Sequence, residues 1–132
     1  MRGIFIDPEK GWWEERDPKD TEEIKEMLGA EFLENPALKV GGEYFGCYCD
    51  RDAREHETHP DTVVMRIRKG FRKRHRYFGY VAGPVFIYLN RGLDDIEVEF
   101  LRRRIFLHED AARTPFLLVE DFQDMLYEES DP

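Results

Sequence analysis

The sequence has no apolar run that approaches the ~20 residues of a membrane-spanning helix. It has two cysteines, Cys47 and Cys49, and a disulfide between residues i and i+2 would be strained. Residues 1–7 form too short an apolar run, with one basic residue, to be a signal peptide. We therefore expect reduced thiols, a cytoplasmic location and no membrane contact.

Serine is almost absent, because Ser130 is the single one. Cys49 could also be a nucleophile, with His56 or His59 as its base, but nothing in the sequence is placed to orient either imidazole. A phosphate-binding loop is also missing, since Gly41-Gly42 lacks the lysine and the following helix of such a loop. We therefore predict a protein that is not an enzyme and has no cofactor.

The length of 132 residues fits one domain, which we place at 1–132 with a frayed tail at 128–132. A content of 41% hydrophobic and 14% aromatic residues is too high for disorder. Charged residues make up 37% of the chain, and the net charge is −9. This balance favours solubility and argues against non-specific nucleic-acid binding by the whole surface.

Short apolar or alternating segments predict a sheet. Residues 12–16 follow a turn and are expected to pair back as a hairpin arm, whereas residues 31–33 form a shorter strand and residues 39–42 turn. The strands that we expect in the sheet are residues 3–6, 43–49, 62–68 and 85–89.

Two segments carry the signals of capped helices. Asp20, Glu23 and Gly29 bracket a helix over residues 21–28, and Thr114-Pro115 begins a second helix that we extend to residue 128. Residues 95–107 fit a helix after Asp94 or a strand, and we favour the helix. The fold class is therefore α+β, with a small antiparallel or mixed sheet and two or three helices packed against it.

The order of these elements resembles a family of small domains of unknown function that is common in bacteriophages and mobile elements. The matching features are Ile6-Asp7-Pro8, the acidic helix closing on Leu28-Gly29, the strand ending Tyr48-Cys49-Asp50, and the apolar strand Gly83 to Leu89. The resemblance covers about residues 1–105. It implies a phage or plasmid origin and a protein that acts against a host process.

Four residues are of types that bind zinc: Cys47, Cys49, His56 and His59. The two cysteines are closer together than in known zinc fingers, and both fit the core face of a strand. We therefore predict no bound metal and keep a small zinc-binding domain as an alternative.

The charges divide along the chain into three blocks. Residues 1–61 hold 17 acidic and 8 basic residues, residues 62–93 hold 8 basic residues and no acid, and residues 94–132 hold 12 acidic and 4 basic residues. The basic block is interleaved with aromatics, as a phosphate-contacting surface requires. The acidic flanks could instead neutralise it, within one chain or in a homodimer.

We predict an acidic interaction protein that binds and inhibits a host nucleic-acid-handling protein through a basic surface of that host protein. The acidic residues that we assign to this contact are Glu22, Glu23, Glu26, Asp121 and Asp124. The alternative is a nucleic-acid-binding module, whose phosphate contacts would be Arg66, Arg68, Lys69, Arg72, Lys73, Arg74 and Arg76.

Overall fold

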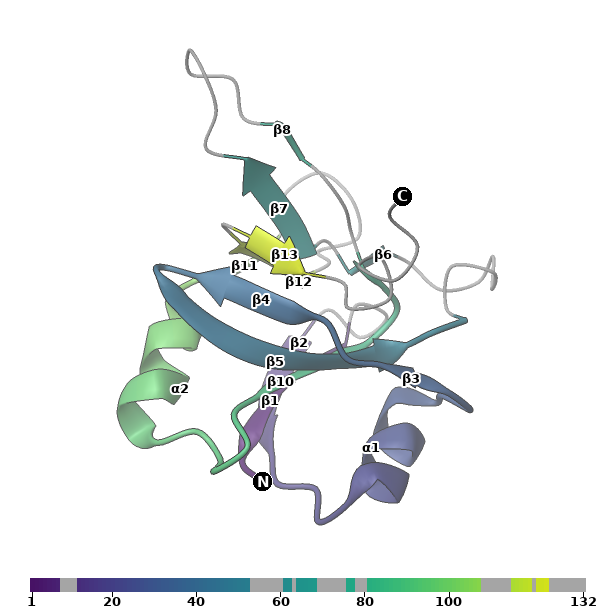
Figure 1. The fold of residues 1–132 in the computed structure, drawn as a ribbon. Helices are drawn as coiled ribbons and strands as arrows, with labels where there is room; N and C mark the ends of the chain where they lie inside the picture. The colour runs from purple at the N-terminus through teal and green to yellow at the C-terminus, as the bar shows by residue number, and fades with distance from the viewer. Residues whose placement is uncertain are drawn as a thin grey trace.

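A computed structural model describes residues 1–7, 12–52, 61–62, 64–68, 76–77, 81–107, 115–119 and 121–123. Within these ranges, side chains are described for residues 1–7, 13–52, 83–105 and 117. Two helices and two main sheets make up this part of the chain, so the fold is α+β (Figure 1). No helix in the described part is long and apolar enough to cross a membrane.

The larger sheet is antiparallel throughout, with the strand order β13-β4-β5-β10-β1-β2 and with β3 paired to β5. Its strands are β1 (Gly3–Asp7), β2 (Trp12–Arg16), β3 (Leu33–Glu34), β4 (Ala37–Val40), β5 (Glu43–Asp50), β10 (Val85–Tyr88) and β13 (Asp121–Gln123). Val85 pairs with Ile6 on one side and with Cys49 on the other. The most apolar strand, β10, therefore lies between β1 and β5, where both of its faces are buried.

The second sheet is mixed and has the order β11-β12-β7-β8. Its strands are β7 (Val64–Arg68), β8 (Arg76–Tyr77), β11 (Ile105–Leu107) and β12 (Pro115–Val119). β12 runs parallel to β7, and the other two pairings are antiparallel. A short ladder of β6 (Asp61–Thr62) and β9 (Val81–Ala82) stands apart from both sheets.

Side-chain caps fix the start of each helix. Helix α1 (Thr21–Leu28) begins at Asp20, whose carboxylate accepts a hydrogen bond of 2.9 Å from the backbone N–H of Glu23, and it ends at Gly29 with φ of 64°. Helix α2 (Asp95–Arg102) begins with a complete capping box, in which Asp94 and Glu97 each accept from the other's backbone N–H.

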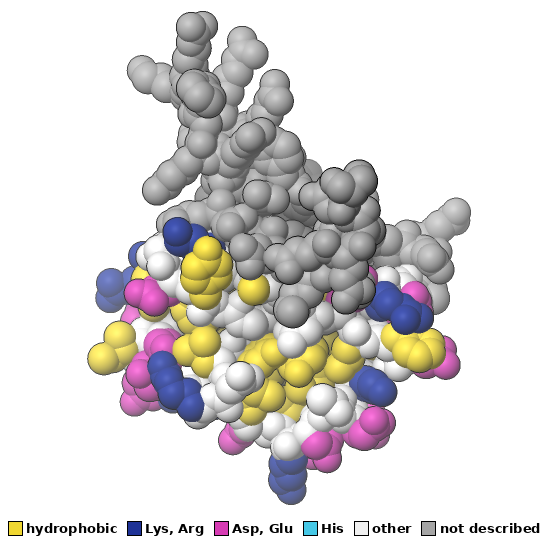
Figure 2. All heavy atoms as spheres, viewed as in Figure 1, with side chains coloured by type: hydrophobic (Ala, Val, Ile, Leu, Met, Phe, Trp, Pro, Cys, Tyr) yellow, Lys and Arg dark blue, Asp and Glu magenta, His cyan; other side chains and the backbone are white. Residues whose placement is uncertain are grey.

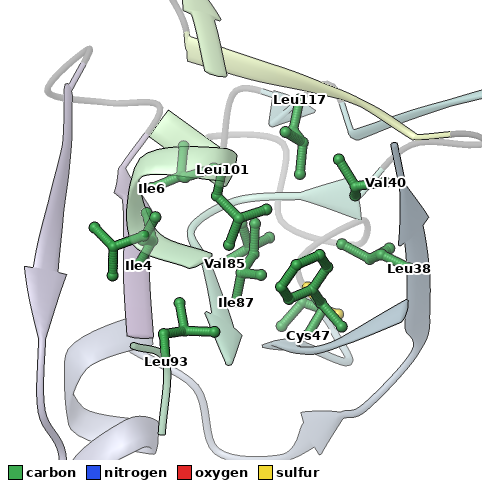
Figure 3. Close-up of a cluster of buried hydrophobic side chains, with 13 residues drawn as sticks. Ile4, Ile6, Leu38, Val40, Cys47, Val85, Ile87, Leu93, Leu101 and Leu117 are labelled. Carbon is green, nitrogen blue, oxygen red and sulfur yellow. The ribbon is translucent and has the colours of Figure 1, made fainter. Parts of the chain in front are cut away.

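The two helices cover opposite faces of the larger sheet. Val98 and Leu101 of α2 pack with one face of β1, β5 and β10, and Leu117 of β12 closes the same core (Figure 3). Ile24 and Leu28 of α1 pack on the other face. Figure 1 shows α1 and α2 on either side of β1 and β10. Because successive side chains of a strand point to opposite faces, this one sheet has a hydrophobic core on each face.

The helix predicted over residues 115–128 is wrong, because the chain forms β12 and β13 there. β12 pairs with β11 on one side and β7 on the other, and Leu117 is fully buried. A short apolar run fits a helix or a strand equally well by itself, and strand partners on both sides decide this case.

The predicted single sheet needs a second correction, since residues 64–68 form a strand that belongs to the smaller sheet. Residues 39–42 were expected to turn, but Lys39 and Val40 end β4 and the turn is confined to Gly41 and Gly42, both at positive φ. Residues 95–102 are a helix, as favoured, and β11 follows it. The hairpin of residues 3–7 and 12–16 is confirmed.

Candidate functional site

Three large apolar side chains are exposed in the described part of the chain. They are Phe32 (45% exposed), Tyr44 (51%) and Ile96 (80%). Tyr44 and Ile96 line one groove of about 650 Å³ between α2 and the start of β5. On the left of Figure 2, over α2 and the start of β5, apolar side chains lie among charges of both signs. This groove is the candidate site.

The groove is formed by the start of β5 and by two segments far from it in sequence but close to each other, the residues after β10 and helix α2. Its lining residues are Glu43, Tyr44, Phe45, Leu89, Asn90, Arg91, Ile96, Glu97 and Phe100. A second hollow, of about 480 Å³, continues along the outer surface of α2 and shares Ile96 and Phe100 with the first. These two residues are one turn apart on α2 and therefore form a ridge between the hollows.

Helix α2 presents this ridge because it turns Val98 and Leu101 inward to the core. Ile96 lies on nearly the opposite side of the helix from them, at 100° per residue. Phe100 is partly buried, and its ring is 6.0 Å from that of Phe45. Rigid elements thus hold the floor of the groove.

One wall of the groove is a closed ion pair. Arg91 Nη1 and Nη2 donate to the two carboxylate oxygens of Glu97 at 2.8 and 2.6 Å. The Arg91 guanidinium lowers the pKa of Glu97 below its ordinary value. Glu97 also accepts from the backbone N–H of Asp94 at 3.0 Å, so the pair is fixed to the start of α2.

Two cations beside the groove lie over aromatic rings. Lys39 Nζ lies 5.6 Å from the centre of the Tyr44 ring, and the guanidinium of Arg104 lies 3.7 Å from the centre of the Phe100 ring. Glu43 is exposed, and it has no ion-pair partner among the described residues.

The predicted acidic contact is not gathered into one patch. Glu22, Glu23 and Glu26 are exposed on α1, where Glu22 is 3.5 Å from Lys25 and Glu23 accepts from the backbone N–H of Lys19 at 2.6 Å. The α1 carboxylates thus serve partly to cap and pair within the helix. Asp121 instead lies in β13, opposite Lys39 of β4, and Asp124 lies outside the described residues (Figure 1).

For the predicted phosphate contacts, the structure describes the backbone of three residues and none of the side chains. Arg66 and Arg68 lie in β7 and Arg76 in β8, and the register pairs Arg68 with Arg76. The remaining predicted contacts lie outside the described residues: Lys69, Arg72, Lys73 and Arg74. Two arginine positions thus face each other across one ladder.

The cysteines of the zinc alternative are core residues. Cys47 is fully buried and Cys49 is 2% exposed, and burial raises the pKa of the Cys47 thiol well above its ordinary value. This environment disfavours the thiolate that binds zinc. His56 and His59 lie outside the described residues. Among the residues described, no group of three or more His, Cys, Asp or Glu side chains could hold a metal ion.

Two buried aspartates were not singled out from the sequence. Asp7 and Asp50 are 9% and 7% exposed, and they end β1 and β5 on either side of β10, at the same end of the sheet. Asp50 accepts from the backbone N–H of Asp52 at 3.0 Å, which stabilises the turn after β5. This hydrogen bond gives Asp50 a role in holding the chain.

The groove itself was also missed in the sequence. Its one local signal is Ile96, an apolar residue among the charges of α2's outer face. Tyr44 and Phe100 come together from β5 and α2 only in the folded chain. Comparisons with protein-family models, curated protein sequences and solved structures found no match to this chain.

Proposed function

We propose that this domain acts by binding a partner protein, without turning over a substrate, and that the groove beside α2 is the contact. The observation that carries the proposal is the position of Tyr44 and Ile96, two of the most exposed large apolar side chains, in one groove. Exposed apolar patches with a polar rim are typical of interaction sites.

The energetics favour such a contact. Burying an exposed isoleucine stabilises a complex by about 1.5–3 kcal/mol. Ile96 stands on a helix whose cap and inner face are fixed, and Tyr44 stands on a paired strand. Little conformational entropy is therefore lost when a partner docks there.

The location of the thiols also supports a binding role. Cys47 and Cys49 are the strongest nucleophiles that the sequence offers, and both lie in the core rather than in the groove. The groove instead offers aromatic and aliphatic contact area with a few charges, which is the composition of a recognition surface.

The family resemblance extends the proposal to the kind of partner. A protein of phage or mobile-element origin would bind and inhibit a host protein that handles nucleic acid and therefore has a basic surface. The net charge of −9, with Glu22, Glu23 and Glu26 exposed on α1, would speed the encounter with such a surface.

A site-specific photocrosslinker tests the proposal. Placed at position 96 it should yield one dominant protein adduct in host cells, because this residue is at the centre of the contact. The matched control is position 32, where Phe32 is also exposed but stacks beneath Arg51, outside the groove. Equal adducts at both positions, or adducts at 32 alone, would contradict the proposal.

Nucleic acid is the second candidate partner, and the pairing of Arg68 with Arg76 favours it. Like charges directly opposite each other destabilise a ladder, and residues 62–93 contain no acid to offset them. A bound polyanion would supply that charge. Titration of labelled single- and double-stranded DNA and RNA at two salt concentrations distinguishes this candidate, since phosphate contacts make affinity strongly salt-dependent.

A further inference from the structure

Two arginines at the end of α2 differ from the other described arginines in having no carboxylate partner. Of the seven arginines whose side chains are described, five form ion pairs. Arg102 and Arg104 form none among the described residues, and they lie instead over the rings of Trp13 and Phe100. The net charge of the chain is −9, so this lack of a partner does not come from a shortage of acid.

Two contacts hold Arg104 in place and leave most of its donors open. Its guanidinium lies 3.7 Å from the centre of the Phe100 ring, and its Nη1 donates to the backbone oxygen of Phe100 at 2.8 Å. A guanidinium has five N–H donors, and Arg104 makes no further hydrogen bond among the described residues. A fixed guanidinium with open donors can bind two oxygens of an anion such as phosphate.

The topology of the smaller sheet brings Arg104 to the end where β7 carries its arginines. β12 lies between β11 and β7, antiparallel to the first and parallel to the second, so the start of β11 and the end of β7 lie at the same end of the sheet. β8 is antiparallel to β7 and therefore begins at that end as well. Arg104 directly precedes β11, and the other arginines at this end are Arg66, Arg68 and Arg76.

The described charges at this end of the sheet are mainly positive. Arg103 is paired with Glu99. Asp121 begins β13 just after β12, but it lies opposite Lys39 of β4, whose charge offsets it. Arg104 therefore adds to the arginines of β7 and β8. The sequence hides this relationship, because Arg104 belongs to the acidic block of residues 94–132.

We infer that this end of the smaller sheet binds the phosphate backbone of a nucleic acid, and that Arg104 makes one of the phosphate contacts. Several cations from three segments suit a polyanion, whose charges repeat along a strand, better than one small anion. The inference rests on nucleic acid as the second candidate partner and adds a contact beside α2 to it. It is separate from the docking of a protein at Ile96.

Fluorescence anisotropy tests the inference, with a labelled DNA duplex titrated with the full chain at several salt concentrations. Arg104→Gln should weaken binding about fivefold at low salt and lower the slope of log affinity against log salt by about 0.9, the value for one phosphate contact. Arg104→Lys keeps the charge and should keep the slope. The matched control is Arg51→Gln, which should bind as the wild type does. Arg51 also lies over a ring, that of Phe32, but it is paired with Asp52.

An unchanged slope in Arg104→Gln, or equal losses in Arg104→Gln and Arg51→Gln, would overturn the inference and leave nucleic acid as a candidate partner. No salt-dependent binding by the wild type would overturn both. Partial unfolding of a variant does not imitate the expected result, because it lowers the amount of active protein and leaves the salt slope of the remainder unchanged. The crosslinking experiment at position 96 tests the groove separately, since it requires no nucleic acid.

Discussion

Arg91 and Glu97 meet through two nitrogen–oxygen hydrogen bonds of 2.6 and 2.8 Å, one to each carboxylate oxygen. The same carboxylate completes the capping box of α2. One residue thus fixes the start of the helix and closes one wall of the groove. Glu43, the third charged residue that lines the groove, makes no ion pair among the described residues.

The pair makes stability depend on pH. Arg91 lowers the pKa of Glu97 in the folded chain below its ordinary value of 4.5. A carboxyl group with a lowered folded pKa stabilises the fold above its unfolded pKa, and this contribution is lost as pH falls through the folded value. Glu97→Gln should therefore reduce the free energy of unfolding by about 1 kcal/mol at neutral pH, since Arg91 is largely exposed.

Urea denaturation at a series of pH values measures this effect. The difference between wild type and Glu97→Gln should be constant above ~pH 5 and should vanish in acid. Glu99→Gln is the control, and it should reduce the free energy of unfolding by less. Glu99 and Arg103 form a single hydrogen bond of 3.2 Å, and this pair is more exposed than Arg91 and Glu97. A difference that stays constant down to ~pH 3 would contradict the account.

Gly41 and Gly42 form the turn between β4 and β5, and alanine at Gly41 should destabilise the protein more than alanine at Gly42. Both Gly41 and Gly42 have positive φ, of 55° and 84°, so alanine costs about 1 kcal/mol at either. At Gly41 the new carbon would also lie 2.6 Å from Cζ of Phe100, whereas nothing lies within 4 Å at Gly42. Gly41→Ala should unfold at lower temperature than Gly42→Ala and should shift the Phe100 ring resonances; equal melting temperatures would contradict this.

The thiols should behave as core groups rather than as zinc ligands. Burial of Cys47 and Cys49 and the raised pKa of Cys47 predict slow reaction with a thiol reagent in the native state and fast reaction after unfolding. Elemental analysis of the purified protein should find no stoichiometric zinc. One zinc per chain that is lost in Cys49→Ser would show that the alternative is correct.

The basic block should matter only if nucleic acid is the partner. Neutralising Arg72, Lys73, Arg74 and Arg76 should then weaken DNA binding and reduce the dependence of log affinity on log salt by about 0.9 for each lost phosphate contact. If a protein partner is correct, the same variant should keep its partner, and DNA binding should be weak in the wild type as well.

Local signals in the sequence predicted α1, and for α2 they favoured a helix while leaving a strand open. Asp20 with Glu23, and Asp94 before α2, act through contacts within four residues, so a short stretch of sequence contains the whole cause. The strands around residues 3–6, 43–49 and 85–89 were recognisable for the same reason, since alternation or a continuous apolar run is also local.

The errors arise where partners are distant in sequence. β12 is a strand because β7, about fifty residues earlier, and β11 pair with it, and apolar spacing in residues 115–126 does not contain that information. The groove is similar, because Tyr44 and Phe100 meet only after β5 and α2 pack. Ile96 was the one residue that could have indicated the site, as an apolar residue on the charged side of α2.

The most direct test of the central claim is the affinity of the crosslinked partner for Ile96→Glu compared with Phe32→Glu. Both changes put a charge in place of an exposed apolar side chain, so both variants should fold as the wild type does. Ile96→Glu removes the isoleucine that the partner would bury, so it should weaken binding about tenfold or more. Phe32→Glu should bind as the wild type does. Unchanged affinity in Ile96→Glu, or equal losses in the two variants, would contradict the assignment of the groove as the binding site.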